Sequence, residues 1–133
     1  MNFSAGGERS EMETYYKKMV DEDPSNALVL RNYAQFLYET KMDLERAEEY
    51  YSRAILAGPG DGEVLAQYAK VVWELHRDEE RACDYFEQAV QAAPHDSHVA
   101  AAYAGFLWET EDDGGDDYNG AQVSYGALAS ATA

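Results

Sequence analysis

The stretch NYAQFLYET, residues 32–40, returns as QYAKVVWEL at 67–75 and as AYAGFLWET at 102–110. Each copy contains a Tyr-Ala pair and, four residues later, an aromatic residue followed by Glu in every case. Successive copies are 35 residues apart, and all three prolines of the chain keep the same spacing, at Pro24, Pro59 and Pro94. A fixed period of this length is typical of a repeat protein whose units stack on one another.

Each period predicts two helices. Short polar residues stand two positions after each proline, where they can cap a helix that runs over 27–40, 62–75 or 97–110; these are Asn26, Asp61 and Asp96. Asp43 and Asp78 can cap second helices over 43–57 and 78–92. A helix pair of this size cannot bury its apolar face alone, so neighbouring pairs must stack. We therefore predict an all-α, right-handed helical-hairpin solenoid of about five helices and roughly two and a half repeats.

The repeated positions resemble a known repeat family. Leu30, Tyr33-Ala34 and Leu37, followed by Ala47, Tyr51, Ala54 and Pro59, resemble the tetratricopeptide (TPR) pattern Trp-x2-Leu-Gly-x2-Tyr…Ala-x3-Phe…Pro. ERAEEYYSRAI and DGEVLAQYAKVVWE are most similar to plant TPR-like proteins, and the half-a-TPR repeats of RNA-processing scaffolds are the second resemblance. The period is 35 instead of 34 residues, Trp is missing at the first position, and Ala replaces Gly.

The ends of the chain depart from the repeat. We expect a flexible N-terminus over 1–10, a TPR-like domain over 11–110, and an acidic, then Gly/Ala/Ser-rich tail over 111–133. Residues 11–22 resemble the second helix of an earlier repeat. The tail composition favours disorder. The alternative is a capping helix over 118–130 that uses Ala121, Tyr125 and Leu128.

The charge of the chain limits its partners. Twenty-six acidic residues against ten basic ones leave a formal net charge of −16, which repels nucleic acid and anionic membranes. We therefore expect a neutral or basic protein partner, no direct nucleic-acid contact and no membrane association. A single cysteine, Cys83, cannot form an internal disulfide, and no secretory signal is recognisable, so the expected location is cytoplasmic or nuclear.

The sequence contains few residues in arrangements typical of catalysis or metal binding. His76 lies about 20 Å from His95 and His98, because a predicted helix separates them, so the three histidines cannot share one metal ion. Glu39, Glu74 and Glu109 recur with the repeat, which favours a solvated ridge over acid–base catalysis. No glycine-rich phosphate loop or nucleophile arrangement is present. We predict no enzyme activity, no cofactor and no metal site.

The TPR resemblance implies that the first helix of each repeat lines a concave groove. The expected groove residues are polar side chains and one aromatic residue per repeat, namely Arg31, Gln35, Tyr38, Gln67, Lys70, Trp73, His98 and Trp108. The aromatic residues either pack between successive repeats or anchor a ligand. Known TPR domains grip acidic chaperone tails with Lys, Asn and Arg; the matching positions here hold Arg31, Gln35, Gln67, His98 and Ala102, which argues against that ligand.

These features favour a non-catalytic adaptor that binds a partner segment in the groove. The first alternative is a scaffold that assembles with itself through the uncapped ends of the solenoid. The second alternative is a half-a-TPR-type subunit of an RNA-processing complex.

Overall fold

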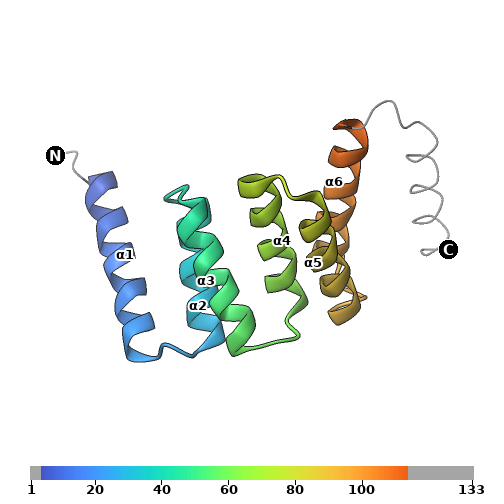
Figure 1. The fold of residues 1–133 in the computed structure, drawn as a ribbon. Helices are drawn as coiled ribbons and strands as arrows, with labels where there is room; N and C mark the ends of the chain where they lie inside the picture. Colours follow the sequence, from blue (N-terminus) through green and yellow to red (C-terminus); the bar gives the residue numbers. More distant parts are fainter. Residues whose placement is uncertain (1–3, 114–133) are drawn as a thin grey trace.

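A computed structural model describes residues 4–113, with the side chains of 11–111. This part of the chain forms six helices: α1 (Ser4–Glu22), α2 (Ala27–Glu39), α3 (Leu44–Ala57), α4 (Gly62–His76), α5 (Glu79–Ala92) and α6 (Ser97–Asp113). Figure 1 shows them in a row from α1 to α6, with each helix antiparallel to the next. The predicted all-α hairpin solenoid is confirmed, with about three repeats.

Two details of the predicted organisation differ from the structure. The described residues contain one helix more than the five predicted, because α1 is a complete helix of 19 residues. It begins at Ser4, ahead of the domain start that we placed at residue 11. The helix α6 continues to Asp113, past the predicted boundary at 110. The predicted tail and the alternative helix over 118–130 lie outside the described residues.

The predicted caps begin the helices. The Asn26 side chain accepts hydrogen bonds from the backbone N–H groups of Leu28 and Val29, at 3.0 and 3.2 Å. Asp61 and Asp96 make the equivalent pair of bonds at α4 and α6, and Asp43 and Asp78 each accept one bond at α3 and α5. Each of these bonds satisfies an N–H group that has no partner within its own helix.

Two tight turns close the hairpins. The residue before the capping aspartate is left-handed in both, with φ of 56° at Met42 and 52° at Arg77. This geometry is uncommon for residues other than glycine. It reverses the chain within a few residues and sets α2 against α3, and α4 against α5, as close antiparallel pairs.

Small residues allow the helices to approach closely. The alanines at the repeated positions of the hairpins are fully buried, at most 1% exposed: Ala34, Ala47, Ala54, Ala69, Ala82 and Ala89. Tyr51 and Phe86 fill the space between these rows. Gly62 makes the tightest approach: a Cβ atom there would lie 2.6 Å from Ala93 Cβ and 2.8 Å from the Ala89 carbonyl oxygen. The loose stretch AGPGDG therefore ends in a glycine that packing requires.

A polar link joins neighbouring hairpins. Glu13 on α1 accepts from the Tyr33 hydroxyl of α2 at 3.2 Å and pairs with Arg46 of α3 at 3.0 Å. Lys41, in the turn between α2 and α3, pairs with the same carboxylate at 3.2 Å. Arg46 also donates to the Tyr33 hydroxyl. The carboxylate on α1 thus meets three donors of the α2–α3 hairpin.

The link recurs one period later. Glu48 on α3 lies 2.9 Å from His76 Nε2 and 3.7 Å from Arg81, and Arg81 donates to the Tyr68 hydroxyl at 3.1 Å. The third copy differs, because Cys83 occupies the position of the glutamate and its sulfur lies 3.8 Å from the Tyr103 hydroxyl. Glu48 therefore holds the α2–α3 and α4–α5 hairpins together.

Candidate functional site

Two adjoining cavities lie between α4 and α6 and share Lys70 and Ala102. The larger has a volume of about 280 Å³, and the smaller about 190 Å³. The larger cavity is lined by Lys70, Glu74, Phe86, Ala101, Ala102, Gly105, Phe106 and Glu109. The smaller is lined by Glu63, Ala66, Gln67, Lys70, His98, Val99 and Ala102. We call the two together the α4–α6 groove.

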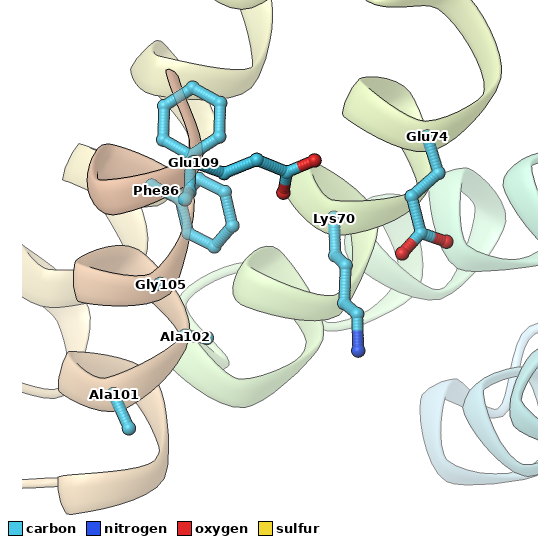
Figure 2. Close-up of a pocket in the computed structure, with 8 residues that line it drawn as sticks. Lys70, Glu74, Phe86, Ala101, Ala102, Gly105 and Glu109 are labelled. Atoms are coloured by element: carbon cyan, nitrogen blue, oxygen red, sulfur yellow. The ribbon is translucent and has the colours of Figure 1, made fainter. Parts of the chain in front are cut away.

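The larger cavity combines an aromatic wall with a charged rim. Phe86 and Phe106 pack with ring centroids 4.9 Å apart, and both are at most 5% exposed. Figure 2 shows Lys70 and Glu74 projecting from α4, while Glu109 extends from α6 toward them. The rim therefore carries one basic and two acidic side chains beside an apolar wall.

Tyr38 of α2 fixes two of these rim residues. Its hydroxyl donates a hydrogen bond of 2.7 Å to Glu74 Oε1, and Lys70 Nζ lies 5.5 Å from the centre of its ring. Burial, and then the hydrogen bond to Glu74, raise the pKa of the Tyr38 hydroxyl well above its usual range. The hydroxyl therefore keeps its proton at neutral pH and acts as a donor toward Glu74.

The smaller cavity holds an acceptor that is not satisfied. Gln67 Oε1 is buried and has no hydrogen-bond partner within residues 11–111. Glu63 of α4, which lines the same cavity, accepts a hydrogen bond of 3.2 Å from Arg31 of α2. A buried carbonyl without a partner is costly, and this atom is too deeply buried for a ligand in the cavity to reach it.

The structure gathers some of the predicted groove residues and separates others. Gln67, Lys70 and His98 line the α4–α6 groove together. Arg31 lies beside it, paired with Glu63. Gln35 is turned to Glu39 of its own helix at 3.3 Å.

The predicted aromatic residues do not share one environment. Tyr38 is half-buried, and Trp73 is only 7% exposed, packed edge to face on Phe106 at 5.6 Å and covered by Arg77. Trp108 is 68% exposed. Trp73 is therefore a packing residue, whereas Trp108 is free to contact a partner.

Sequence reasoning missed several residues that shape the groove. Phe106 was not selected, although it occupies the same repeat position as Phe36. Phe86 was not selected either, and Glu74 and Glu109 were assigned to a solvated ridge, yet all three line the larger cavity. The period of 35 residues shows which positions correspond in successive repeats, but it does not reveal which of them line a cavity.

The arrangement suits recognition of a chain segment. An open groove with an apolar wall and a few charges matches the general make-up of binding sites. Within the side chains described, no group of three or more His, Cys, Asp and Glu residues is placed to hold a metal ion. No helix of the described part is both long and apolar enough to cross a membrane.

Comparisons with known proteins agree with this fold. A family model described as TmcB, TPR repeats, matches residues 7–59. No curated protein sequence matches the chain. The first TPR domain of Spaghetti (RPAP3), solved with the HSP90 peptide SRMEEVD, has a TM-score of 0.67 at 18% identity, over 80% of this chain and 82% of that one.

Two further structures are similar to the chain. The second TPR domain of human RPAP3, solved with the HSP70 peptide SGPTIEEVD, has a TM-score of 0.65 at 20% identity, over 78% of this chain and 85% of that one. The TPR domain of Arabidopsis OM64 has a TM-score of 0.64 at 19% identity, over 77% of this chain and 83% of that one. The described helices, their 35-residue period and these matches lead to one conclusion: residues 4–113 have the fold of a tetratricopeptide-repeat domain, and residues 7–59 match a TPR family model.

Proposed function

We propose that this domain is a non-catalytic adaptor that holds a segment of a partner protein in the α4–α6 groove. The observation that carries the proposal is that two cavities lie next to each other, with Lys70 and Ala102 lining both. Two neighbouring cavities can accommodate successive side chains of one extended segment. Two domains of similar fold are solved with peptides bound, which supports this use of the fold.

The acidic chaperone tails bound by those domains are not the ligand that we propose. Ala102 replaces a basic residue at one of the positions that grip such tails, and Gln67 stands at another. Glu74 and Glu109 add negative charge to the same groove. A terminal carboxylate and its acidic neighbours would meet repulsion there. We propose a neutral or basic partner.

Selection from a library of random nonapeptides, displayed on phage, tests the proposal. Peptides enriched on the immobilised full chain should lose at least tenfold in affinity on Ala102→Phe, because the new ring fills the part that both cavities share. Ala100→Phe is the matched control, since Ala100 is exposed on the same helix and lines neither cavity. Equal losses in both variants, or no loss in either, would place the binding surface elsewhere.

Self-assembly is a second candidate, favoured by one face of α6. Ala104 is exposed, whereas its counterparts Ala34 and Ala69 are fully buried under α3 and α5, and Trp108 lies one turn further along the same helix. A second copy could cover this face and bury Trp108. Light scattering over a range of concentrations tests this candidate: a mass that rises with concentration in the native chain, and less in Trp108→Ser, supports it, and a constant monomer mass rejects it.

A further inference from the structure

The larger cavity of the groove has the volume of a site for a single side chain. Pockets that hold whole small ligands measure about 300–1,000 Å³. At about 280 Å³, this cavity lies just below that range, and its lining combines two phenylalanine rings with a charged rim. A long side chain with an apolar stem and a polar end fits such a lining.

The charges of the rim select a cation. Lys70 forms no ion pair with either carboxylate among the described residues; its Nζ lies instead over the Tyr38 ring. Glu74 accepts a hydrogen bond from the neutral Tyr38 hydroxyl and forms no ion pair among the described residues, so two carboxylates face one lysine at this rim. Glu109 pairs with Arg77 at 3.4 Å, and both side chains are more than half exposed. An exposed pair of this kind is worth only about 0–1 kcal/mol, so a ligand can replace it.

The two carboxylates distinguish between the two long cationic side chains. The planar guanidinium of arginine donates to two carboxylates at once, whereas the lysine ammonium is a strongly hydrated point charge. Glu74 and Glu109 supply acceptors from two helices, and the buried Phe86 and Phe106 form the apolar wall behind them. The cavity therefore favours arginine over lysine.

The adjoining cavity has a place for the backbone beside that side chain. Its walls include Ala66, Val99 and Ala102, whose small side chains let a peptide come close. The two cavities together offer one position for a side chain and room for the main chain that precedes or follows it.

We infer that the α4–α6 groove recognises a basic segment of a partner protein, with an arginine side chain in the larger cavity between Glu74 and Glu109. This inference rests on the proposed function and adds the chemistry of the ligand. It is opposite in sign to the acidic peptides held by the similar domains.

Three synthetic peptides, acetyl-Ala-Leu-X-Leu-Ala-amide, test the inference, with X as arginine, citrulline or glutamate. Citrulline has the shape of arginine without its charge. Nuclear magnetic resonance titration of the labelled full chain at low salt should show the arginine peptide shifting the amide signals of Lys70, Glu74 and Gly105. We expect the citrulline peptide to bind about fivefold more weakly, and the glutamate peptide more weakly still.

A pair of double variants separates the groove from the overall charge. Glu74→Gln with Glu109→Gln should weaken the arginine peptide about fivefold and leave the citrulline peptide unchanged. Glu49→Gln with Glu80→Gln removes the same two charges from exposed positions of α3 and α5, and should change neither. Circular dichroism melting confirms that each variant is folded.

The outcomes distinguish the two proposals. Equal binding of the arginine and citrulline peptides, or tighter binding of the glutamate peptide at the same signals, overturns the arginine inference and leaves groove binding standing. Shifts confined to residues outside the groove, or none with any of the three peptides, overturn the arginine inference as well; the proposed function then depends on the nonapeptide selection, which does not assume a ligand.

Discussion

Arg46 on α3 lies 3.0 Å from Glu13 on α1, so a hairpin is held to the preceding helix by an ion pair that crosses α2. The side chain of Glu13 is only 15% exposed, and Tyr33 and Lys41 complete its environment. Burial alone would raise the pKa of Glu13, but hydrogen bonds from Arg46 and Lys41 outweigh it and hold the pKa below its usual range. The folded state therefore favours the ionised form.

This pKa predicts how acid affects the protein. A carboxyl group with a lowered pKa in the folded state stabilises the fold above its unfolded pKa, near 4.5, and loses that contribution as the pH falls through the lower, folded value. Glu13→Gln should therefore be less stable than the native chain at pH 7, with a smaller loss of stability on acidification. Urea unfolding at several pH values measures both effects. Glu11→Gln, exposed on the same helix, should keep the native pH dependence.

The alanine rows predict a contrast between equivalent positions. Ala69 is fully buried where α4 meets α5, whereas Ala104, one period later, is exposed on α6. Ala69→Leu should lower the free energy of unfolding by about 1–3 kcal/mol, because the added carbons force the helices apart. Ala104→Leu should change it by less than about 0.5 kcal/mol. An unchanged melting temperature for Ala69→Leu would contradict close packing at this row.

Two glycines predict opposite effects of the same substitution. Gly62→Ala places a methyl group 2.6 Å from Ala93 Cβ and should destabilise the fold by about 1–3 kcal/mol. At Gly105 nothing lies within 4 Å of an added Cβ, and the residue is inside α6. Gly105→Ala should therefore stabilise the fold by about 0.5–1 kcal/mol, because alanine loses less entropy in a helix. Melting temperatures that change in the same direction in both variants would contradict this prediction.

The tyrosines predict a loss of stability in alkali. Burial, partly offset by the charge of Arg46, raises the pKa of Tyr33 to about 12, and burial also raises those of Tyr51 and Tyr103. The unfolded chain releases these protons near pH 10, so stability should be complete below that value and decline between pH 10 and 12. Tyrosinate absorbance should rise together with the loss of helical circular dichroism. If all tyrosines ionise near pH 10 while the helices stay intact, burial does not raise their pKa values and the prediction is wrong.

The fold was predictable because each repeat contains the same pattern of capping residues and small apolar residues. Asn26, Asp43, Asp61 and Asp78 begin their helices as their spacing indicates, and the buried alanines fall at the repeated positions. Local capping and helical periodicity depend on residues close in sequence, so the sequence reveals them directly. The left-handed turns at Met42 and Arg77 carry no such signal, because neither residue favours that geometry.

The candidate site was harder to foresee. Gln67, Lys70 and His98 were selected by their place on first helices, and they do line the groove. Phe86 and Phe106 come from a second and a first helix, and their meeting beside Glu109 depends on how α5 and α6 cross. A period in sequence fixes which positions are equivalent, but the end of the repeat at α6 makes equivalent positions differ, as Trp73 and Trp108 do.

The links through Glu13 and Glu48 determine how much of the chain unfolds at once. Each link draws on three successive helices, so the hairpin α2–α3 cut out alone would contain neither link whole. The two links overlap at α3, which supplies Arg46 to one and Glu48 to the other. Melting of α3 therefore releases α1 and α5 together, and the array unfolds as one cooperative unit instead of hairpin by hairpin.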